Sequence, residues 1–353
     1  MLGFLKKTIF FWILSAALLG GITSKVEAAN IVVSIKPIHS LVATITKGVS
    51  DPYLIIKGRG SPHGFSLRPS DAKKIRNAQV IFWIGDEIET FLTKPLKTIG
   101  KRATIVSLST AEGLTKLNYR NKKDFKFKPK AGHDDHKGHD DHKGHDDHKG
   151  HDDHKGHDDH KGHDDHKGHA GHKGHDHDGV DQHFWLDPAN AIAFSYKIET
   201  TLQALDPRNA KVYSKNAKQL RKGLAKLMKN TAARMKPLKQ RPFIVFHDAY
   251  QYFENRFGLT AAGSVVTNPE LSTSAKQVSQ IKKRIKKIGA YCVFMEPQFN
   301  PKLAKLLTRG TGARLSRIDP LGVDLKDGAG LYIKLIENIS KSFEDCLSAT
   351  HKH

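Results

Sequence analysis

A six-residue unit, His-Asp-Asp-His-Lys-Gly, repeats six times between His133 and Gly168, and it limits what this chain can fold into. Of the 22 histidines in the sequence, 16 lie between His133 and His177. Each unit has a glycine and three charged residues but no apolar side chain, so the units can neither form a core nor stack as a solenoid. We therefore expect residues 132–179 to be a disordered insertion within a folded chain.

Histidine falls at every third position through most of this insertion. Neutral imidazole is a common ligand for transition metals, and aspartate adds oxygen ligands. The alternative is a hydrophilic spacer. We predict weak auxiliary metal sites at the sixteen histidines, which are His133, His136, His139, His142, His145, His148, His151, His154, His157, His160, His163, His166, His169, His172, His175 and His177.

The charge of the chain is divided between the insertion and the rest. Residues 132–179 carry a net charge of −7, so the remaining 305 residues carry +29. The composition excludes a collagen, a wholly disordered acidic chain and a protein with many membrane spans. A basic surface attracts nucleic acid or anionic lipid non-specifically, but solubility in an anion-rich compartment explains the charge equally well. We expect no nucleic-acid partner.

The N-terminus indicates export. Lys6 and Lys7 precede an apolar run over residues 9–19, and small residues around Ala28 follow. This is the pattern of a secretory signal peptide, here residues 1–28. The apolar run is shorter than the roughly 20 residues that span a bilayer, although an N-terminal anchor is the alternative. No cysteine follows the run to carry a lipid, so we expect a mature protein in the bacterial periplasm.

Cys292 and Cys346 are the only cysteines. In an exported protein an isolated pair is expected to form one disulfide. A cysteine metal site is then not expected, because no thiolate would remain.

Outside the insertion, short apolar runs alternate with segments of helical spacing. This alternation predicts α/β architecture with parallel sheets. Strands are expected over 31–35, 53–57, 79–84, 103–107, 243–246 and 291–295, and helices over 39–47, 70–77, 87–98, 188–205 and 329–348. Helical spacing also continues for nearly thirty residues after Asp206-Pro207. Such a helix is about 40 Å long, which suggests a rigid connector between two α/β halves.

Six histidines lie outside the repeat: His39, His63, His183, His247, His351 and His353. The last two belong to a C-terminal tail. His247 directly follows an expected strand, and ligands of open α/β sheets bind beyond the carboxyl ends of strands. A lone histidine is more often structural than functional, so spacing alone leaves a structural interpretation open for each of the other four.

Five motifs decide between these interpretations. They are Gly60-Ser-Pro-His-Gly-Phe-Ser-Leu-Arg-Pro-Ser-Asp71, His183-Phe-Trp-Leu-Asp-Pro188, Phe246-His-Asp-Ala-Tyr250, Cys292-Val-Phe-Met-Glu-Pro-Gln-Phe299 and Asp319-Pro-Leu-Gly322. In this order, and with a His-rich insertion between the first two, they resemble the zinc-binding periplasmic proteins of ABC importers, the ZnuA type. The motifs cover nearly all of the mature chain.

This resemblance implies two Rossmann-like lobes with mainly parallel sheets, joined by a long connector helix, with the metal in the cleft between the lobes. The expected organisation is a signal peptide (1–28), an N-terminal lobe (29–205) with the insertion (132–179), a connector helix (206–238) and a C-terminal lobe (239–353). The implied activity is capture of Zn²⁺ and its delivery to an inner-membrane permease with its ATPase, by a monomer.

Carried over by motif, the family's zinc ligands fall on His63, His183 and His247, and Asp319 matches an aspartate that completes related sites. Manganese-type relatives have a carboxylate where this chain has His247, and imidazole favours the softer zinc. Some zinc members have Glu directly before the first ligand, where this chain has Pro62. The fourth position is therefore open to Asp319, a water or a histidine of the insertion.

Two further residues near these motifs are given other roles. Glu296 lies in a family motif and is expected to be structural. His39 lies near an expected strand end and is a lesser ligand candidate.

Other functions are compatible with parts of this pattern. Three histidines with an open fourth position also describe catalytic zinc, but no His-Glu-x-x-His helix or general base accompanies them, so an enzyme is not expected. A manganese-type binding protein and a metal-dependent adhesin are the alternatives that remain.

Overall fold

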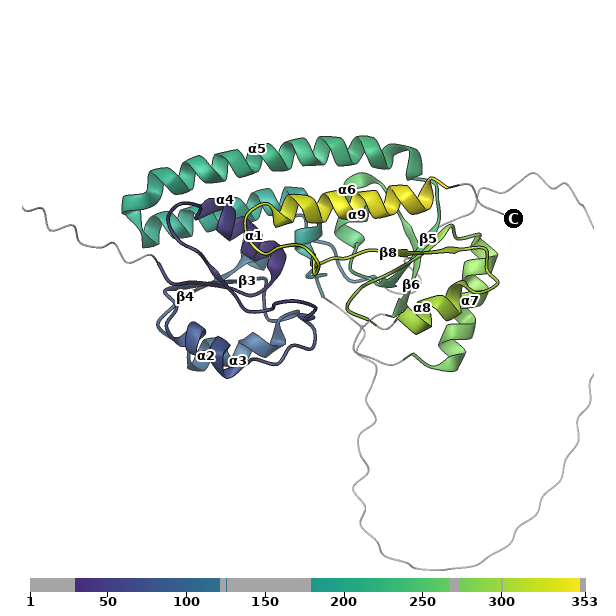
Figure 1. Cartoon of the computed structure of the whole chain (residues 1–353), viewed down its shortest axis with the longest axis horizontal. Coiled ribbons are helices and arrows are strands. Elements are labelled where there is room, and N and C mark those ends of the chain that lie inside the picture. Colours follow the sequence, from purple (N-terminus) through teal and green to yellow (C-terminus); the bar gives the residue numbers. More distant parts are fainter. Residues whose placement is uncertain (1–28, 121–124, 126–178, 267–272, 300, 350–353) are drawn as a thin grey trace, which may run out of the picture. The chain divides into compact units, whose positions relative to one another are not determined.

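The computed structural model describes residues 29–120, 125, 179–266, 273–299 and 301–349 (Figure 1). The expected signal peptide, the sixteen histidines of the insertion and the tail histidines His351 and His353 lie outside these residues. The chain divides into two compact units. The first comprises Met1–Thr115, Phe184–Thr231 and Asp319–Ile339, and the second comprises Lys116–His183, Ala232–Ile318 and Ser340–His353.

The first unit is built on a four-stranded parallel sheet in the order β2-β1-β3-β4. The strands are β1 (Ile31–Val33), β2 (Tyr53–Leu54), β3 (Val80–Trp83) and β4 (Thr104–Ser107). Val33 lies in register with Leu54 on one side and Phe82 on the other. The side chains of β1 and β3 are buried throughout, as expected of strands covered by helices on both faces.

Helices α1 (Lys36–Ile45) and α4 (Pro188–Leu205) pack together on one face of this sheet, and α2 (Pro69–Arg76) and α3 (Thr90–Thr98) lie on the other (Figure 1). The bounds of α4 are those expected from the sequence: the Asp187 side chain accepts from the Ala189 N–H at 2.8 Å, and Pro188 occupies the first helical position. The helix expected over 39–47 begins three residues earlier than predicted. The helix begins at Lys36, because proline is compatible with a first turn that lacks N–H partners.

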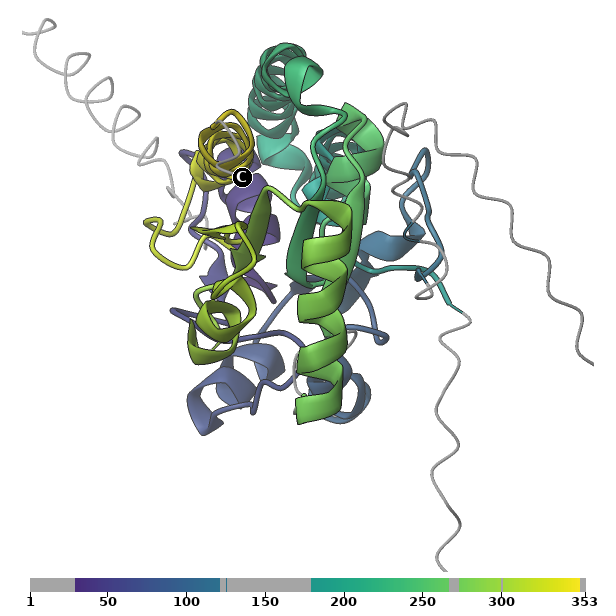
Figure 2. The ribbon, with the colours of Figure 1, turned by 90° about the vertical axis from the view of Figure 1, so that its right-hand side faces the viewer.

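The second unit repeats this arrangement, with the strand order β6-β5-β7-β8. Its strands, β5 (Phe243–His247), β6 (Ala261–Val266), β7 (Cys292–Met295) and β8 (Arg314–Arg317), are all parallel. Helix α6 (Gln251–Phe257) follows β5, and α7 (Ala275–Ile288) and α8 (Pro301–Thr308) pack together against the sheet. Figure 2 shows α7 lengthwise beside these strands.

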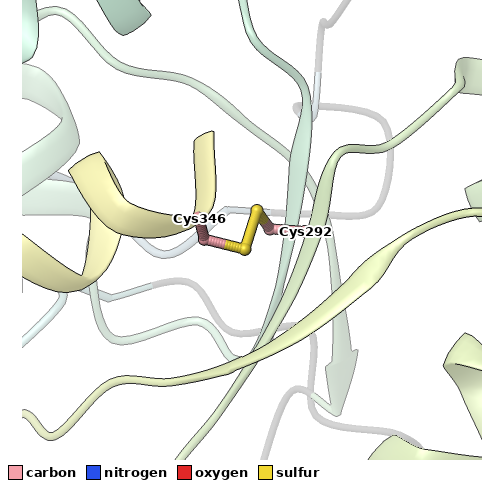
Figure 3. The surroundings of a disulfide bond; sticks show 2 residues. All are labelled: Cys292 and Cys346. Carbon is pink, nitrogen blue, oxygen red and sulfur yellow. A yellow bond between two sulfur atoms is a disulfide. The ribbon is translucent and has the colours of Figure 1, made fainter. Parts of the chain in front are cut away.

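The expected disulfide is confirmed. Cys292 of β7 is bonded to Cys346 of α9 (Leu331–Leu347), with the two Cα atoms 6.2 Å apart (Figure 3). Phe343, one turn earlier in α9, lies against the rings of Phe243 and Phe294 in the same core. The bond therefore ties the last turns of α9 to the centre of the second sheet.

Helix α5 (Ala210–Met235) connects the two units along the chain and is preceded by a 3₁₀ turn over Pro207–Asn209. The expected fold of two α/β lobes with parallel sheets and a long connecting helix is thus confirmed. Within the described residues, no helix is long and apolar enough to cross a membrane.

Both sheets have the same switch in strand order. In each, the chain extends the sheet on one side of its first strand and then returns to the other side. In the second unit this switch lies between β5 and β7. Ligands of open α/β sheets bind where such a switch meets the carboxyl ends of the strands.

Candidate metal centre

His247 is the last residue of β5, and Glu296 directly follows the neighbouring strand β7. The two side chains meet at the switch point of the second sheet. Nδ1 of His247 lies 2.7 Å from Oε1 of Glu296, and only 5% and 1% of these side chains are exposed. An ionised carboxylate only accepts hydrogen bonds, so Nδ1 donates and Nε2 of His247 is left with its lone pair.

His183 lies in the segment that follows the insertion, and its ring contacts that of His247. Asn118 and Val180 form an isolated antiparallel bridge, and the Asp181 N–H donates to the Leu117 carbonyl at 2.8 Å. Two residues later, His183 donates to Oδ1 of Asp181 through both its backbone N–H, at 3.0 Å, and its ring Nδ1, at 2.7 Å. The buried Asp181 carboxylate thus fixes the ring of His183 as Glu296 fixes that of His247.

The two rings face each other through their other nitrogens. Nε2 of His183 lies 3.3 Å from Nε2 of His247. When both Nδ1 atoms donate to carboxylates, two neutral rings direct lone pairs at each other, which is unfavourable unless a proton or a cation lies between them. Two nitrogens bound to tetrahedral zinc at 2.0–2.1 Å are about 3.4 Å apart. The observed separation therefore matches one edge of a tetrahedral metal site.

The surroundings of His247 change its acidity. Burial by itself would lower the pKa of His247, but the charge and hydrogen bond of Glu296 outweigh it, and Asp248 and Asp181 add to the effect, so the pKa is raised above its ordinary value. The ring of Phe299 lies edge-on to His247, with centroids 6.1 Å apart. An apolar wall of this kind limits the access of water to a metal ligand.

His63 belongs to the first unit, in the loop between β2 and α2, and is half-buried. Its backbone N–H donates to Oγ of Ser61 at 3.3 Å. Gly60 allows the loop to pass close to the sheet, because a Cβ at this position would lie 2.7 Å from Cγ2 of Ile56. The motif glycine therefore sets the path of the loop that carries the histidine.

Asp319 also belongs to the first unit, where its carboxylate closes a turn. Oδ1 accepts from the N–H groups of Leu321 and Gly322 at 3.0 and 2.9 Å, and Oδ2 accepts from Val323 at 2.7 Å. The carbonyl of the next residue, Pro320, accepts from Nε1 of Trp185 at 2.8 Å. Two of the motifs are thus joined to each other by this turn.

His39, the lesser ligand candidate, has a backbone carbonyl as its ring partner, where His183 and His247 have carboxylates. It is buried in α1, and its Nε2 lies 2.9 Å from the Pro52 carbonyl. Burial lowers its pKa. We interpret His39 as a packing residue that ties α1 to the segment before β2.

Two residues contact the rings of the histidines in a role that the sequence patterns do not predict. Asp181 belongs to none of the five motifs, although a carboxylate two residues before a candidate ligand is a signal that can be searched for. Glu296 was expected to be structural, but its contact with His247 joins residues 49 apart in the sequence, and no local pattern reports it. Asp248, which is adjacent to His247 in sequence, instead binds Arg120.

Comparisons with known proteins agree with this geometry. The family model described as zinc-uptake complex component A, periplasmic, ZnuA, matches residues 31–346. A protein of Brucella suis named high-affinity zinc uptake system protein ZnuA is 52% identical over 322 residues, which is 91% of this chain and 92% of that protein. A Haemophilus influenzae protein of the same name is 37% identical, covering 98% of this chain and all of its own length.

Solved structures show the same fold. A ZnuA deletion mutant with zinc bound aligns with a TM-score of 0.68 at 20% identity, covering 92% of this chain and 100% of that one. The laminin-binding adhesin Lmb of Streptococcus agalactiae aligns with a TM-score of 0.65 at 21% identity, covering 90% and 98%. With the family model spanning both units and identities above 50% over nearly the whole length, this chain belongs to the ZnuA family of periplasmic zinc-uptake components.

Proposed function

We propose that this protein binds Zn²⁺ in the periplasm and delivers it to an inner-membrane ABC permease with its ATPase. The observation that carries the proposal is the pair of facing Nε2 atoms of His183 and His247, 3.3 Å apart. Each ring is held by a buried carboxylate at 2.7 Å. Carboxylates in this position orient metal-binding histidines and raise their basicity. The name shared by the relatives, high-affinity zinc uptake system protein, supports the same function.

In this proposal His63 supplies the third imidazole. The support is its position in the first family motif and the glycine-dependent path of its loop. Three neutral imidazoles leave one position of a tetrahedral site open. Asp319, a water or a histidine of the insertion supplies the fourth ligand. Asp319 is the first of these to test, although its oxygens already accept three N–H groups.

Zinc is favoured over manganese by the donor atoms. Both described candidate ligands of the second unit are nitrogens, those of His183 and His247, whereas hard cations prefer oxygen. The sixteen histidines of the insertion collect zinc weakly and raise its local concentration. The protein is a monomer without enzymatic activity, and residues 1–28 are removed on export.

The test uses competition against a chromophoric chelator, which reports only the tightest zinc site of the full chain. His63→Ala, His183→Ala and His247→Ala should each weaken that site by about 10–100-fold or more, since even the partners of ligands contribute this much. His39→Ala is the matched control, because His39 is also a buried histidine and its ring contacts a backbone carbonyl. It should leave zinc affinity unchanged. Unchanged affinity in His183→Ala would refute the proposed site.

A further inference from the structure

Arg120 binds two carboxylates of the second unit at once. Its Nε donates to Oδ2 of Asp248 at 3.0 Å, and its Nη2 contacts the other oxygen of the same carboxylate. Nη1 and Nη2 donate to the two oxygens of Glu254 at 2.7 and 2.9 Å. The three side chains are only 11%, 13% and 3% exposed. A guanidinium that forks onto two carboxylates in this way is geometrically specific.

Both carboxylates belong to the segment that follows His247, from the end of β5 into α6. Asp248 is the residue after His247, and Glu254 lies in α6, which follows. Oε2 of Glu254 also accepts from the N–H of Ala261, the first residue of β6, at 2.8 Å. Arg120 therefore holds the turn after His247, the helix behind it and the start of the next strand in one arrangement.

Residues of α6 in this segment also position His183, through their contacts with Asp181. Nε2 of Gln251, at the start of α6, donates to Oδ2 of Asp181 at 3.2 Å. The hydroxyl of Tyr252 donates to the Asp181 backbone carbonyl at 2.6 Å. Because Oδ1 of Asp181 receives the ring of His183, both imidazoles are positioned from residues 247–254, the segment that Arg120 clamps.

Arg120 is itself held in place at the base of the insertion. The N–H of its neighbour Tyr119 donates to the Gly179 carbonyl at 2.9 Å. Its guanidinium lies 4.8 Å from the ring centroid of Phe125, which is buried. Arg284 of α7 donates to the Phe125 carbonyl at 3.3 Å. Arg120 is thus held next to α7, through Phe125, and next to the Asn118–Val180 bridge that precedes His183.

We propose that Arg120 is a positioning residue for zinc binding: it keeps the rings of His183 and His247 at the separation that a tetrahedral site requires. This inference rests on the proposed function, in which both rings are ligands. Binding sites tolerate displacements of their ligands of only about 0.5 Å. If residues 247–254 relax, the site should therefore bind zinc more weakly although every candidate ligand is still present.

The test uses the full chain and two kinds of variant. Arg120→Met alone leaves two buried carboxylates without a counter-charge and is at risk of not folding. Arg120→Met is therefore combined with Asp248→Asn and Glu254→Gln, which removes the clamp and its charges together. Arg120→Lys keeps the charge but cannot fork onto both carboxylates.

The matched control is an ion pair of the first unit. Arg221 donates to Glu199 at 2.7 Å and lies over the ring of Tyr196 at 4.1 Å, as Arg120 lies over Phe125. Arg221→Met with Glu199→Gln removes a comparable part-buried clamp that holds neither candidate ligand of the second unit.

We expect the triple variant to bind zinc about tenfold more weakly at the tightest site, measured by chelator competition. The visible absorption of the protein with one equivalent of Co²⁺, which reports ligand geometry, should change with it. Arg120→Lys should recover part of the affinity, and the control should change neither quantity.

Wild-type affinity and spectrum in the triple variant, or an equal loss in the control, would overturn the inference. If His183→Ala also binds zinc normally, the proposed function fails; if only the Arg120 variants are normal, this inference alone fails.

Discussion

Nδ1 of His247 and Oε1 of Glu296 lie 2.7 Å apart across two hydrogen-bonded parallel strands, with one residue ending β5 and the other directly following β7. The contact places an acceptor-only group against one ring nitrogen and directs the other nitrogen toward His183. The switch in strand order thus brings together a candidate ligand and the carboxylate that orients its ring.

Glu296→Gln should change how zinc binding depends on pH. Glu296 raises the pKa of His247, and zinc must displace the proton of this ring. The wild-type affinity should therefore begin to fall at a pH above the ordinary value of about 6.5. Without the carboxylate charge the fall should begin at lower pH, while the plateau affinity at alkaline pH drops by about 10–100-fold. Chelator competition between about pH 5 and 8 checks both effects.

The same shift affects the stability of the zinc-free protein. Because the folded-state pKa of His247 is raised above the unfolded value, the protonated ring stabilises the fold. This contribution is fully present below about pH 6.5 and is lost as the pH rises through the folded pKa. Thermal unfolding in the presence of a chelator should show this loss in the wild type and a smaller one in Glu296→Gln. Identical pH profiles would contradict the assignment.

Asp319→Asn separates the role of this residue in a turn from a role in binding. Its carboxylate accepts three backbone N–H groups, so replacing one oxygen by an amide nitrogen should cost about 1–3 kcal/mol of unfolding free energy. Zinc affinity should fall by less than in His183→Ala. Thermal unfolding and chelator competition on the same samples give the two values. A loss of affinity as large as that of the histidine variants would make Asp319 a ligand.

Reduction of the Cys292–Cys346 disulfide should destabilise the second unit without weakening zinc binding. The bond closes a loop with a sequence separation of 54, for which the chain-entropy model gives about 4 kcal/mol. Cys292→Ser with Cys346→Ser should therefore unfold at lower temperature, with the affinity of the tightest site retained. Titration of the native protein with a thiol reagent should find no free thiol. Two reactive thiols would show that the bond does not form.

Deleting residues 132–179 should reduce the zinc stoichiometry to about one ion per chain. The repeat has no apolar side chain to pack, and fixing such a segment around a metal costs about 1–2 kcal/mol per residue. We therefore expect the histidines of the insertion to bind zinc more weakly than a preformed site. Calorimetry of the full and deleted chains should show loss of the weak sites and little change in the tight one. If the deleted chain binds no zinc tightly, a histidine of the insertion is an essential ligand.

Short-range patterns in the sequence determined the elements and the class of fold. The start of α4 follows from Asp187 and Pro188, whose effects on the helix N-terminus are local. The alternation of apolar runs and helical segments predicted the parallel sheets. The disulfide was predicted because the sequence has only two cysteines and a signal-peptide pattern. The family motifs, which are also local, identified His183 and His247 as candidate ligands.

Only the tertiary structure decided what holds those histidines. Glu296 lies 49 residues from His247, and Arg120 lies 128 residues from Asp248. Asp319–Ile339 joins the first unit although it follows the last strand of the second. Sequence periodicity reports which face of an element is buried, because it depends on neighbours along the chain. It carries no information about which carboxylate meets which ring, because that is set by how the strands are ordered and packed.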